Sequence, residues 1–207
     1  MIPQSAAVVV MSRAPVPGKT KTRLIPTLGA ERAARLHRHM LDSTVRAAKA
    51  ANLGPVIVAC TPDDTDPFFG WLRETHGVLT LAQVAGDLGA RMRRALEQAL
   101  VCSNAAMVVG SDCPGLCQED FEHGFEFLRT GYDVVVGPST DGGYYLLGLR
   151  VSHPSLFQNI EWGTSKVLAQ TEKQLRADGC SYGLLSERTD VDVAADLQVY
   201  PRLLNRL

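Results

Sequence analysis

The sequence predicts an α/β protein in which a mostly parallel, twisted sheet has helices on both faces and one inserted antiparallel element. Short apolar, β-rich runs alternate with helix-patterned segments along most of the chain. Asp141-Gly142-Gly143 separates two of the β-rich runs and is typical of a hairpin turn. No repeat, low-complexity tract or linker interrupts the 207 residues. We therefore expect one domain spanning residues 1–207.

The chain opens with a predicted strand–loop–helix unit. A β-branched strand at residues 6–11 leads into a basic loop, and a helix follows from about residue 29 to 51, with Leu36, Met40 and Thr44 on its inner face. Further strands are expected at residues 56–60, 78–83, 105–110, 133–137, 144–149 and 181–185. Further helical segments are expected at residues 68–75, 88–103, 118–130 and 164–178, and after residue 192.

The composition is that of a soluble globular protein. Hydrophobic residues make up 45% of the chain and charged residues 21%. The apolar runs are far shorter than the ~18–20 residues that a membrane span needs, so we expect no membrane insertion. The start of the chain lacks the pattern of a secretory signal, and five irregularly spaced cysteines suit reduced thiols. We expect a cytoplasmic protein; its oligomeric state stays open.

The charge is unevenly distributed. Residues 1–50 hold nine Lys/Arg against two Asp/Glu, whereas the rest of the chain holds 12 against 20. Four of the early cations crowd into one loop, and a small polyanion is the partner that this pattern favours. A nucleic-acid partner is not expected, because the acidic remainder would repel a long phosphate backbone.

The crowded loop runs from Arg13 to Arg23 and suits a phosphate chain. Its glycine and hydroxyl residues stand beside cations. Lys19 and Arg23 are candidates for neutralising phosphate charge, and Lys19 is for this reason also a candidate catalytic residue. Gly18-Lys19-Thr20 is no Walker motif, because arginine occupies position 13 where that motif needs glycine. The candidate nucleotide-binding residues in this loop are Ala14, Pro15, Gly18, Lys19 and Arg23. A proline-stiffened loop with incidental charges is the alternative.

Two acidic segments should lie near this loop, since ligands bind beyond the carboxyl ends of the strands in such sheets. Ser111 and Asp112 follow one strand. Ser111 is a candidate nucleotide-binding residue, and Asp112 is a candidate catalytic residue and ligand for Mg²⁺ or Mn²⁺. Asp192, in a later loop, is the candidate second metal ligand. Each acid could instead cap a turn or a helix.

Three further segments are candidates for contacting substrates. Asp87 and Arg91 lie at the start of a helix and could meet a base or phosphate, although Asp87 could simply cap that helix. Asp141 is a candidate for orienting or deprotonating an acceptor hydroxyl, although a plain hairpin tip also explains it. The candidate acceptor-binding residues are Gly142, Gly143, Tyr144, Trp162 and Thr164.

Six ordered motifs together resemble a known family. They are Ala14–Leu24, Gly86–Met92, Gly110–Pro114, Pro138–Leu149, Trp162–Thr164 and Asp190–Asp192. They are similar to those of GT-A-fold transferases labelled rSAM/selenodomain-associated or arsenosugar-biosynthesis glycosyltransferases, and the match spans nearly the whole chain. The resemblance implies a three-layer GT-A (Rossmann-like), nucleotide-diphospho-sugar transferase fold. It also implies that Asp112 holds a divalent metal and that Asp192 completes the site.

The first loop and the helix after it also look like those of 2-phospholactate guanylyltransferases. The sequence thus predicts a divalent-metal-dependent transferase that takes a nucleotide sugar or nucleoside triphosphate and a small-molecule acceptor. Glycosyl transfer would release a nucleoside diphosphate, and this reaction is slightly preferred because of the family resemblance. Nucleotidyl transfer would release pyrophosphate and is favoured by the basic loop. A catalytically silent nucleotide-binding protein is the third alternative.

Overall fold

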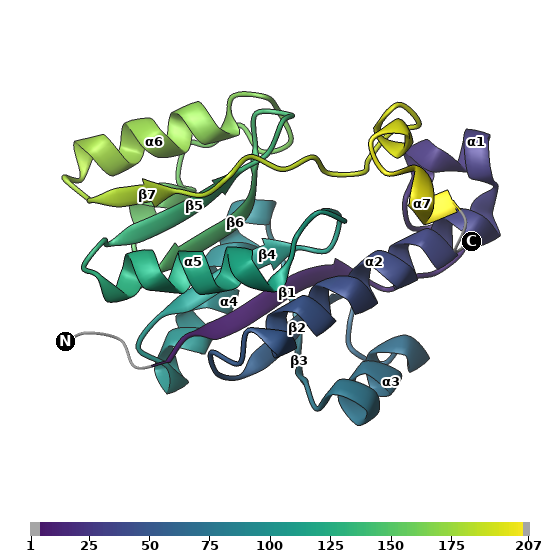
Figure 1. Cartoon of the computed structure of the whole chain (residues 1–207), viewed down its shortest axis with the longest axis horizontal. Helices are drawn as coiled ribbons and strands as arrows, with labels where there is room; N and C mark the ends of the chain where they lie inside the picture. Colours follow the sequence, from purple (N-terminus) through teal and green to yellow (C-terminus); the bar gives the residue numbers. More distant parts are fainter. Residues whose placement is uncertain (1–4, 205–207) are drawn as a thin grey trace.

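A computed structural model describes residues 5–204 and contains one seven-stranded sheet (Figure 1). Its strands are β1 (Ala7–Arg13), β2 (Val56–Thr61), β3 (Leu79–Ala82), β4 (Ala106–Gly110), β5 (Val134–Pro138), β6 (Tyr144–Leu149) and β7 (Tyr182–Leu184). Their spatial order is β3-β2-β1-β4-β6-β5-β7. β6 is antiparallel to both of its neighbours, and the other pairings are parallel. The predicted fold class and the inserted antiparallel element are therefore confirmed.

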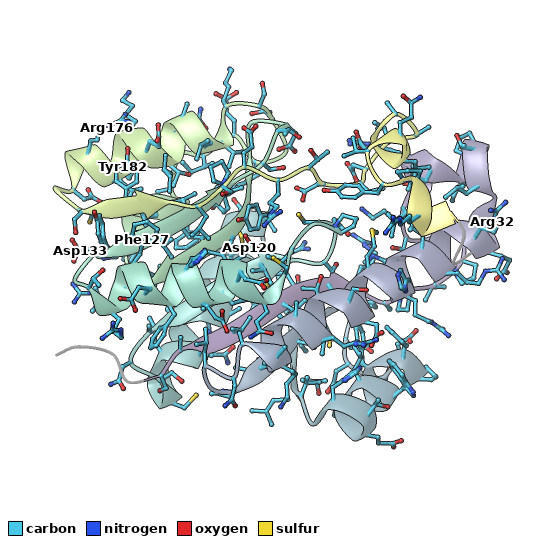
Figure 2. All side chains as sticks on the ribbon, in the orientation of Figure 1. Arg32, Asp120, Phe127, Asp133, Arg176 and Tyr182 are labelled. Carbon is cyan, nitrogen blue, oxygen red and sulfur yellow. The ribbon has the colours of Figure 1, made fainter. Side chains whose placement is uncertain are left out.

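Helices cover both faces of this sheet, and Figure 2 shows the side chains on the same ribbon. The main ones are α2 (Ala30–Ala50), α3 (Pro67–His76), α4 (Leu88–Cys102), α5 (Gln118–Arg129) and α6 (Val167–Ala177). Successive side chains of a strand point to opposite faces, so β1 supplies Val8 to the core beneath α2 and α5 and Val9 to the core beneath α4 and α6. Within residues 5–204, no helix is both long enough and apolar enough to cross a membrane.

The C-terminal segment packs against the first loop and the start of α2, at the carboxyl ends of the strands. After β7 the chain crosses the sheet, drawn in yellow in Figure 1, and reaches the start of α2. Val191, Leu197 and Leu203 there form a buried cluster with Leu24 and Leu36. This apolar contact fixes the acidic C-terminal segment against the basic first loop.

Two expected elements differ in detail. The first loop contains a short 3₁₀ turn, η1 (Thr22–Leu24), and a one-turn helix, α1 (Ile25–Leu28), where the sequence predicts irregular structure. The helix expected after residue 192 is divided into η3 (Asp196–Gln198) and α7 (Pro201–Leu204). Proline cannot continue a preceding helical hydrogen-bond pattern, so Pro201 starts a new segment.

Candidate functional site

A cavity of about 620 Å³ lies beyond the carboxyl ends of the central strands. We call it the phosphate cleft. Lys19, Lys21 and Arg23 from the first loop line it together with Asp112 after β4 and Asp192 from the C-terminal segment. Arg13, Ser111 and Asp141 also line it. The structure thus brings together the basic loop and the acidic segments, as the sequence predicts.

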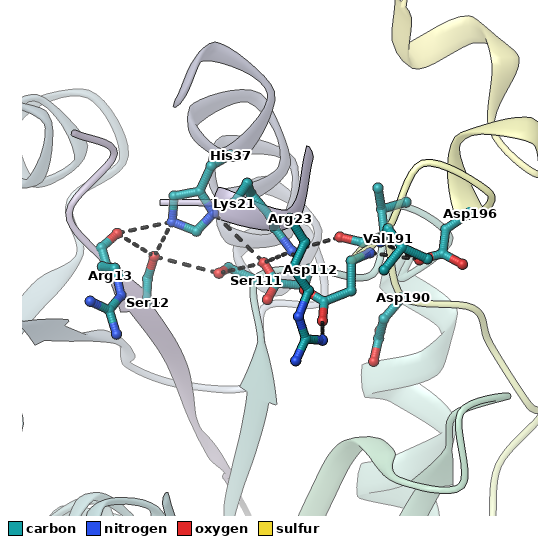
Figure 3. Close-up of polar contacts among 12 residues, drawn as sticks. Ser12, Arg13, Lys21, Arg23, His37, Ser111, Asp112, Asp190, Val191 and Asp196 are labelled. Carbon is teal, nitrogen blue, oxygen red and sulfur yellow. Dashed lines mark hydrogen bonds and ion pairs between the residues drawn. The ribbon is translucent and has the colours of Figure 1, made fainter. Parts of the chain in front are cut away.

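Lys21 joins the two acidic segments. Its Nζ lies 3.0 Å from Oδ1 of Asp112 and 3.5 Å from Oδ1 of Asp192, and it donates to the Val191 carbonyl at 2.6 Å (Figure 3). The Lys21 side chain is 4% exposed. Its backbone adopts a left-handed conformation with φ 46°, which is uncommon for residues other than glycine. The ammonium therefore occupies the space between the two candidate metal ligands.

The C-terminal segment is held in place by hydrogen bonds. The Val191 amide donates to the Asp112 carbonyl at 2.8 Å. The Asp196 carboxylate accepts from the amides of Asp192 and Val193, both at 2.8 Å. Arg23 Nη1 donates to Asp192 Oδ2 at 2.7 Å, although the Arg23 side chain is 70% exposed. Asp192 is thus positioned by its own turn and by two cations.

Asp112 is an anion stabilised by nearby cationic groups. Burial by itself would raise the pKa of Asp112, but the Lys21 ammonium and the His37 ring together outweigh it and hold that pKa well below its usual range. His37 Nδ1 is buried, has no hydrogen-bond partner among residues 5–204, and faces the same carboxylate at 3.6 Å. His37 Nε2 lies 2.9 Å from the Arg13 carbonyl and so donates to it. His37 thereby links the end of β1 to the acid after β4.

Asp190 has the opposite electrostatic environment. Burial raises the pKa of Asp190 to about 6, and the charges of Asp112 and Asp141 act in the same direction. Ser139 Oγ donates to Asp190 Oδ2 at 3.0 Å and partly opposes this shift. Asp190 lines a second cavity of about 190 Å³, which we call the aromatic cavity.

The aromatic cavity adjoins the phosphate cleft. Leu88, Asp141 and Gly163 line both spaces. Of the residues predicted to bind the acceptor, Gly143, Tyr144, Trp162 and Thr164 line this cavity. Gly142 does not; it forms the hairpin turn at φ +86°, where an added Cβ would lie 2.3 Å from the Ser165 carbonyl oxygen. Gly142 therefore shapes the wall that Gly143 and Tyr144 present.

Several predicted nucleotide-binding residues lie outside the lining of the phosphate cleft. Ala14 and Pro15 are buried beneath the first loop, and Gly18 turns that loop at φ +78°. Asp87 caps α4 by accepting from the Ala90 amide at 2.8 Å. Arg91 Nε donates to the Gly86 carbonyl at 2.9 Å. These residues shape the surrounding loops, and Lys19, Arg23 and Ser111 face the cleft.

The residues of the cleft fit a hard divalent cation. Two carboxylates converge on Lys21 Nζ, and Mg²⁺ takes one or two carboxylates and completes its shell with water and phosphate oxygens. No group of three or more His, Cys, Asp or Glu residues that could hold a metal ion occurs among residues 5–204. Any divalent ion here would thus complete its shell with water or with oxygens from a bound substrate.

The chain belongs to the DUF2064 family, described as an uncharacterized protein conserved in bacteria, whose model matches residues 44–164. Its fold is also that of a protein from Desulfovibrio desulfuricans G20, which carries a provisional assignment as a nucleotide-diphospho-sugar transferase. That protein is 30% identical, with a TM-score of 0.85 over 94% of this chain and 85% of that one. A comparison with curated proteins finds no match.

More distant structures share the fold alone. A CMP:2-keto-3-deoxy-manno-octonic acid synthetase complexed with CTP has 13% identity and a TM-score of 0.58 over 98% of this chain and 99% of that one. Rv0371c from Mycobacterium tuberculosis H37Rv, in complex with manganese, has 16% identity and a TM-score of 0.59 over 99% and 100%. The nucleotide-diphospho-sugar transferase fold that the sequence predicts is therefore confirmed. The expectation that the chain is a transferase agrees with the descriptions of its neighbours.

Sequence reasoning missed the roles of three residues in this site. Lys21 was one of four cations in a loop, and no spacing rule separates it from Lys19. Asp190 stands two residues before Asp192, and this close spacing gave no sign that the two carboxylates have different environments. His37 lies on the buried face of α2, where the sequence alone does not distinguish a core histidine from one that reaches a site.

Proposed function

We propose that this protein is a divalent-metal-dependent transferase that acts at the phosphates of a nucleotide, and that it transfers a glycosyl group from a nucleotide-diphospho-sugar. The observation that carries the proposal is the convergence of Asp112 and Asp192 on Lys21 Nζ, at 3.0 and 3.5 Å, within a cleft whose other wall carries Lys19 and Arg23. Two carboxylates of the kind that bind a divalent cation thus face two cations of the kind that bind phosphate.

The metal site consists of Asp112 and Asp192. A bound Mg²⁺ or Mn²⁺ would neutralise charge that develops on the leaving phosphate. Lys19 and Arg23 would bind other phosphate oxygens of the donor, and Lys21 would move from the carboxylates to the phosphate as the nucleotide enters. These cations would act on charge that grows in the transition state, where electrostatic stabilisation is most effective.

The acceptor would approach from the aromatic cavity. Asp141 lines both spaces, and its Oδ1 accepts from the Gly143 amide at 2.9 Å, which fixes the carboxylate at their junction. We assign Asp141 to orient the acceptor hydroxyl and to take its proton. The provisional assignment of the Desulfovibrio desulfuricans protein as a nucleotide-diphospho-sugar transferase supports glycosyl transfer, because that neighbour shares 30% identity over most of both chains.

Nucleotidyl transfer is the second candidate, and the four cations of the first loop favour it because a triphosphate carries more charge than a diphosphate. Incubation with Mg²⁺ or Mn²⁺ and panels of nucleotide sugars and nucleoside triphosphates separates the two reactions. Release of nucleoside diphosphate from a nucleotide sugar supports the proposal, whereas release of pyrophosphate from a triphosphate supports the second candidate. Nucleotide binding without turnover of any compound would indicate the third alternative, a catalytically silent nucleotide-binding protein.

A further inference from the structure

The two connected spaces differ in charge. The phosphate cleft is lined by four Lys or Arg side chains, namely Arg13, Lys19, Lys21 and Arg23, and by three carboxylates, Asp112, Asp141 and Asp192. The aromatic cavity is lined by two carboxylates, Asp141 and Asp190, and none of the described residues that line it is a lysine, arginine or histidine. A ligand that extends from the phosphate cleft into the aromatic cavity therefore leaves the cations behind and meets carboxylates as the only charged groups of the described lining.

The rest of the aromatic cavity is apolar. Its walls include Leu88, Met92, Tyr144, Trp162 and Val167. The rings of Tyr144 and Trp162 meet edge to face, with centroids 6.4 Å apart. Gly89 permits this arrangement, since a Cβ there would lie 2.6 Å from the indole of Trp162. Such a wall suits the apolar face of a ring, and a volume of about 190 Å³ suits a small one.

The two carboxylates are held in place and can still accept hydrogen bonds. Ser139 donates to Oδ2 of Asp190 at 3.0 Å, and the Gly143 amide donates to Oδ1 of Asp141 at 2.9 Å. An ionised carboxylate accepts about four hydrogen bonds, so both groups can receive more donors. Hydroxyl and ammonium groups are donors, whereas phosphates and carboxylates of a ligand would be repelled.

We infer that the acceptor is a small, hydroxyl-bearing ring compound that is neutral or positively charged, and that acceptors carrying a phosphate or carboxylate are rejected. This inference rests on the proposed function, because the aromatic cavity is an acceptor site only when a nucleotide sugar fills the phosphate cleft. In the reaction, the acceptor hydroxyl oxygen bonds to the anomeric carbon, and the bond from that carbon to the phosphate oxygen breaks. The nucleoside diphosphate leaves with the electron pair, and the hydroxyl proton passes to Asp141.

The same inference weakens the case for an attacking phosphate. Such a group would have to approach Asp141 and Asp190 while the cations of the first loop are paired with the nucleotide. Like charges placed opposite one another disfavour a complex strongly, and this is a common means of excluding the wrong ligand. The aromatic cavity therefore selects an acceptor that attacks through a hydroxyl group.

The charge of the aromatic cavity can be measured without a substrate. The chain has two tryptophans, Trp71 and Trp162, so the Trp71→Phe variant leaves Trp162 as the single reporter. We expect caesium ions to quench its fluorescence at least about twofold more effectively than iodide, relative to neutral acrylamide. Adding Asp141→Asn and Asp190→Asn should abolish that preference, whereas Asp178→Asn, an exposed acid at the end of α6, should not. Equal or stronger quenching by iodide would overturn the inference.

Acceptor choice is tested with matched rings that differ in charge: glucose, glucosamine, glucose 6-phosphate and glucuronate, and the corresponding galactose series. Donor turnover is first measured with water as acceptor, and a protein that turns over no nucleotide sugar would refute the proposed function but not the quenching result. With an active donor, we expect transfer to neutral or amino compounds to exceed transfer to the anionic ones at least tenfold. Preference for an anionic compound, or no transfer to any compound, would overturn the inference.

Discussion

Asp112 and Asp190 lie near one another at the carboxyl edge of the sheet, yet their environments have opposite effects on them. Lys21 and His37 together hold the pKa of Asp112 well below its usual range against the effect of burial, whereas burial raises the pKa of Asp190 to about 6. The difference lies in the partners: Asp112 has an ammonium at 3.0 Å, and Asp190 has a serine hydroxyl at 3.0 Å and two acidic neighbours. Asp112 is paired with a cation, whereas Asp190 lines the cavity that we propose for the acceptor.

The largest expected effect comes from the acid beside Lys21. Asp112→Asn removes the negative charge and keeps the shape of the side chain, so we expect turnover of the nucleotide sugar to fall by about 10²–10³-fold, the range seen when one stabilising group is removed from a transition state. Steady-state kinetics across a Mn²⁺ titration measures this. Asp178→Asn is the control, since it removes an exposed acid at the end of α6. Unchanged turnover with unchanged Mn²⁺ dependence would remove Asp112 from the mechanism.

Substitution of Asp190, the acid of the aromatic cavity, should change the free energy of unfolding. Because the pKa of Asp190 is raised in the folded protein, its ionisation destabilises the fold once the pH rises from about 4 through 6. Asp190→Asn avoids this cost and keeps an acceptor for Ser139. We expect the variant to gain about 2 kcal/mol in free energy of unfolding at pH 8 and little at pH 4.

Urea unfolding of the wild type and Asp190→Asn at both pH values measures this difference. Asp112→Asn serves as the comparison, because its effect on the free energy of unfolding should have the opposite sign. The lowered pKa of Asp112 contributes stability at neutral pH, and this stability is lost as the pH falls below the usual pKa of an aspartate. If Asp190→Asn were less stable than the wild type at pH 8, the contrast between the two acids would fail.

The smallest expected effect concerns Lys21 itself. Its ammonium lies where a divalent ion would bind, so Lys21→Met should raise the affinity of the free protein for Mn²⁺ by about tenfold, or about 1.4 kcal/mol. Lys19→Met is the matched control: it removes a cleft cation that forms no ion pair with either acid in the described part of the chain. Electron paramagnetic resonance of free Mn²⁺ gives both affinities. Equal values for the two variants would show that Lys21 does not compete with the metal.

The sequence predicted the order of elements well because each carries its own local signal. β1 is a run of β-branched and apolar residues, and the hairpin before β6 is marked by Asp141-Gly142-Gly143. The meeting of Asp112 with Asp192 also followed from the rule that ligands bind beyond the carboxyl ends of such strands. Local patterns and a topological rule were therefore enough to predict where the site lies.

The contacts inside the site could not be predicted in the same way. That Lys21, and not Lys19, reaches the acids depends on a left-handed backbone at Lys21 and on the packing of Val191 beside Leu24 and Leu36. The contribution of Asp190 depends on the depth of its burial. These are tertiary effects, and neighbouring residues of the same type in one loop do not differ in sequence pattern.

The most direct test of the account is whether metal and nucleotide bind together at Asp112 and Asp192. Mn²⁺ binding is measured by electron paramagnetic resonance with and without ADP, CDP, GDP and UDP, for the wild type and for the Asp112→Asn, Asp192→Asn double variant. The account predicts that at least one nucleoside diphosphate strengthens Mn²⁺ binding to the wild type by tenfold or more, and that the double variant loses this gain. Nucleotide-dependent Mn²⁺ binding that persists in the double variant, or no gain with any of the four nucleotides, would contradict it.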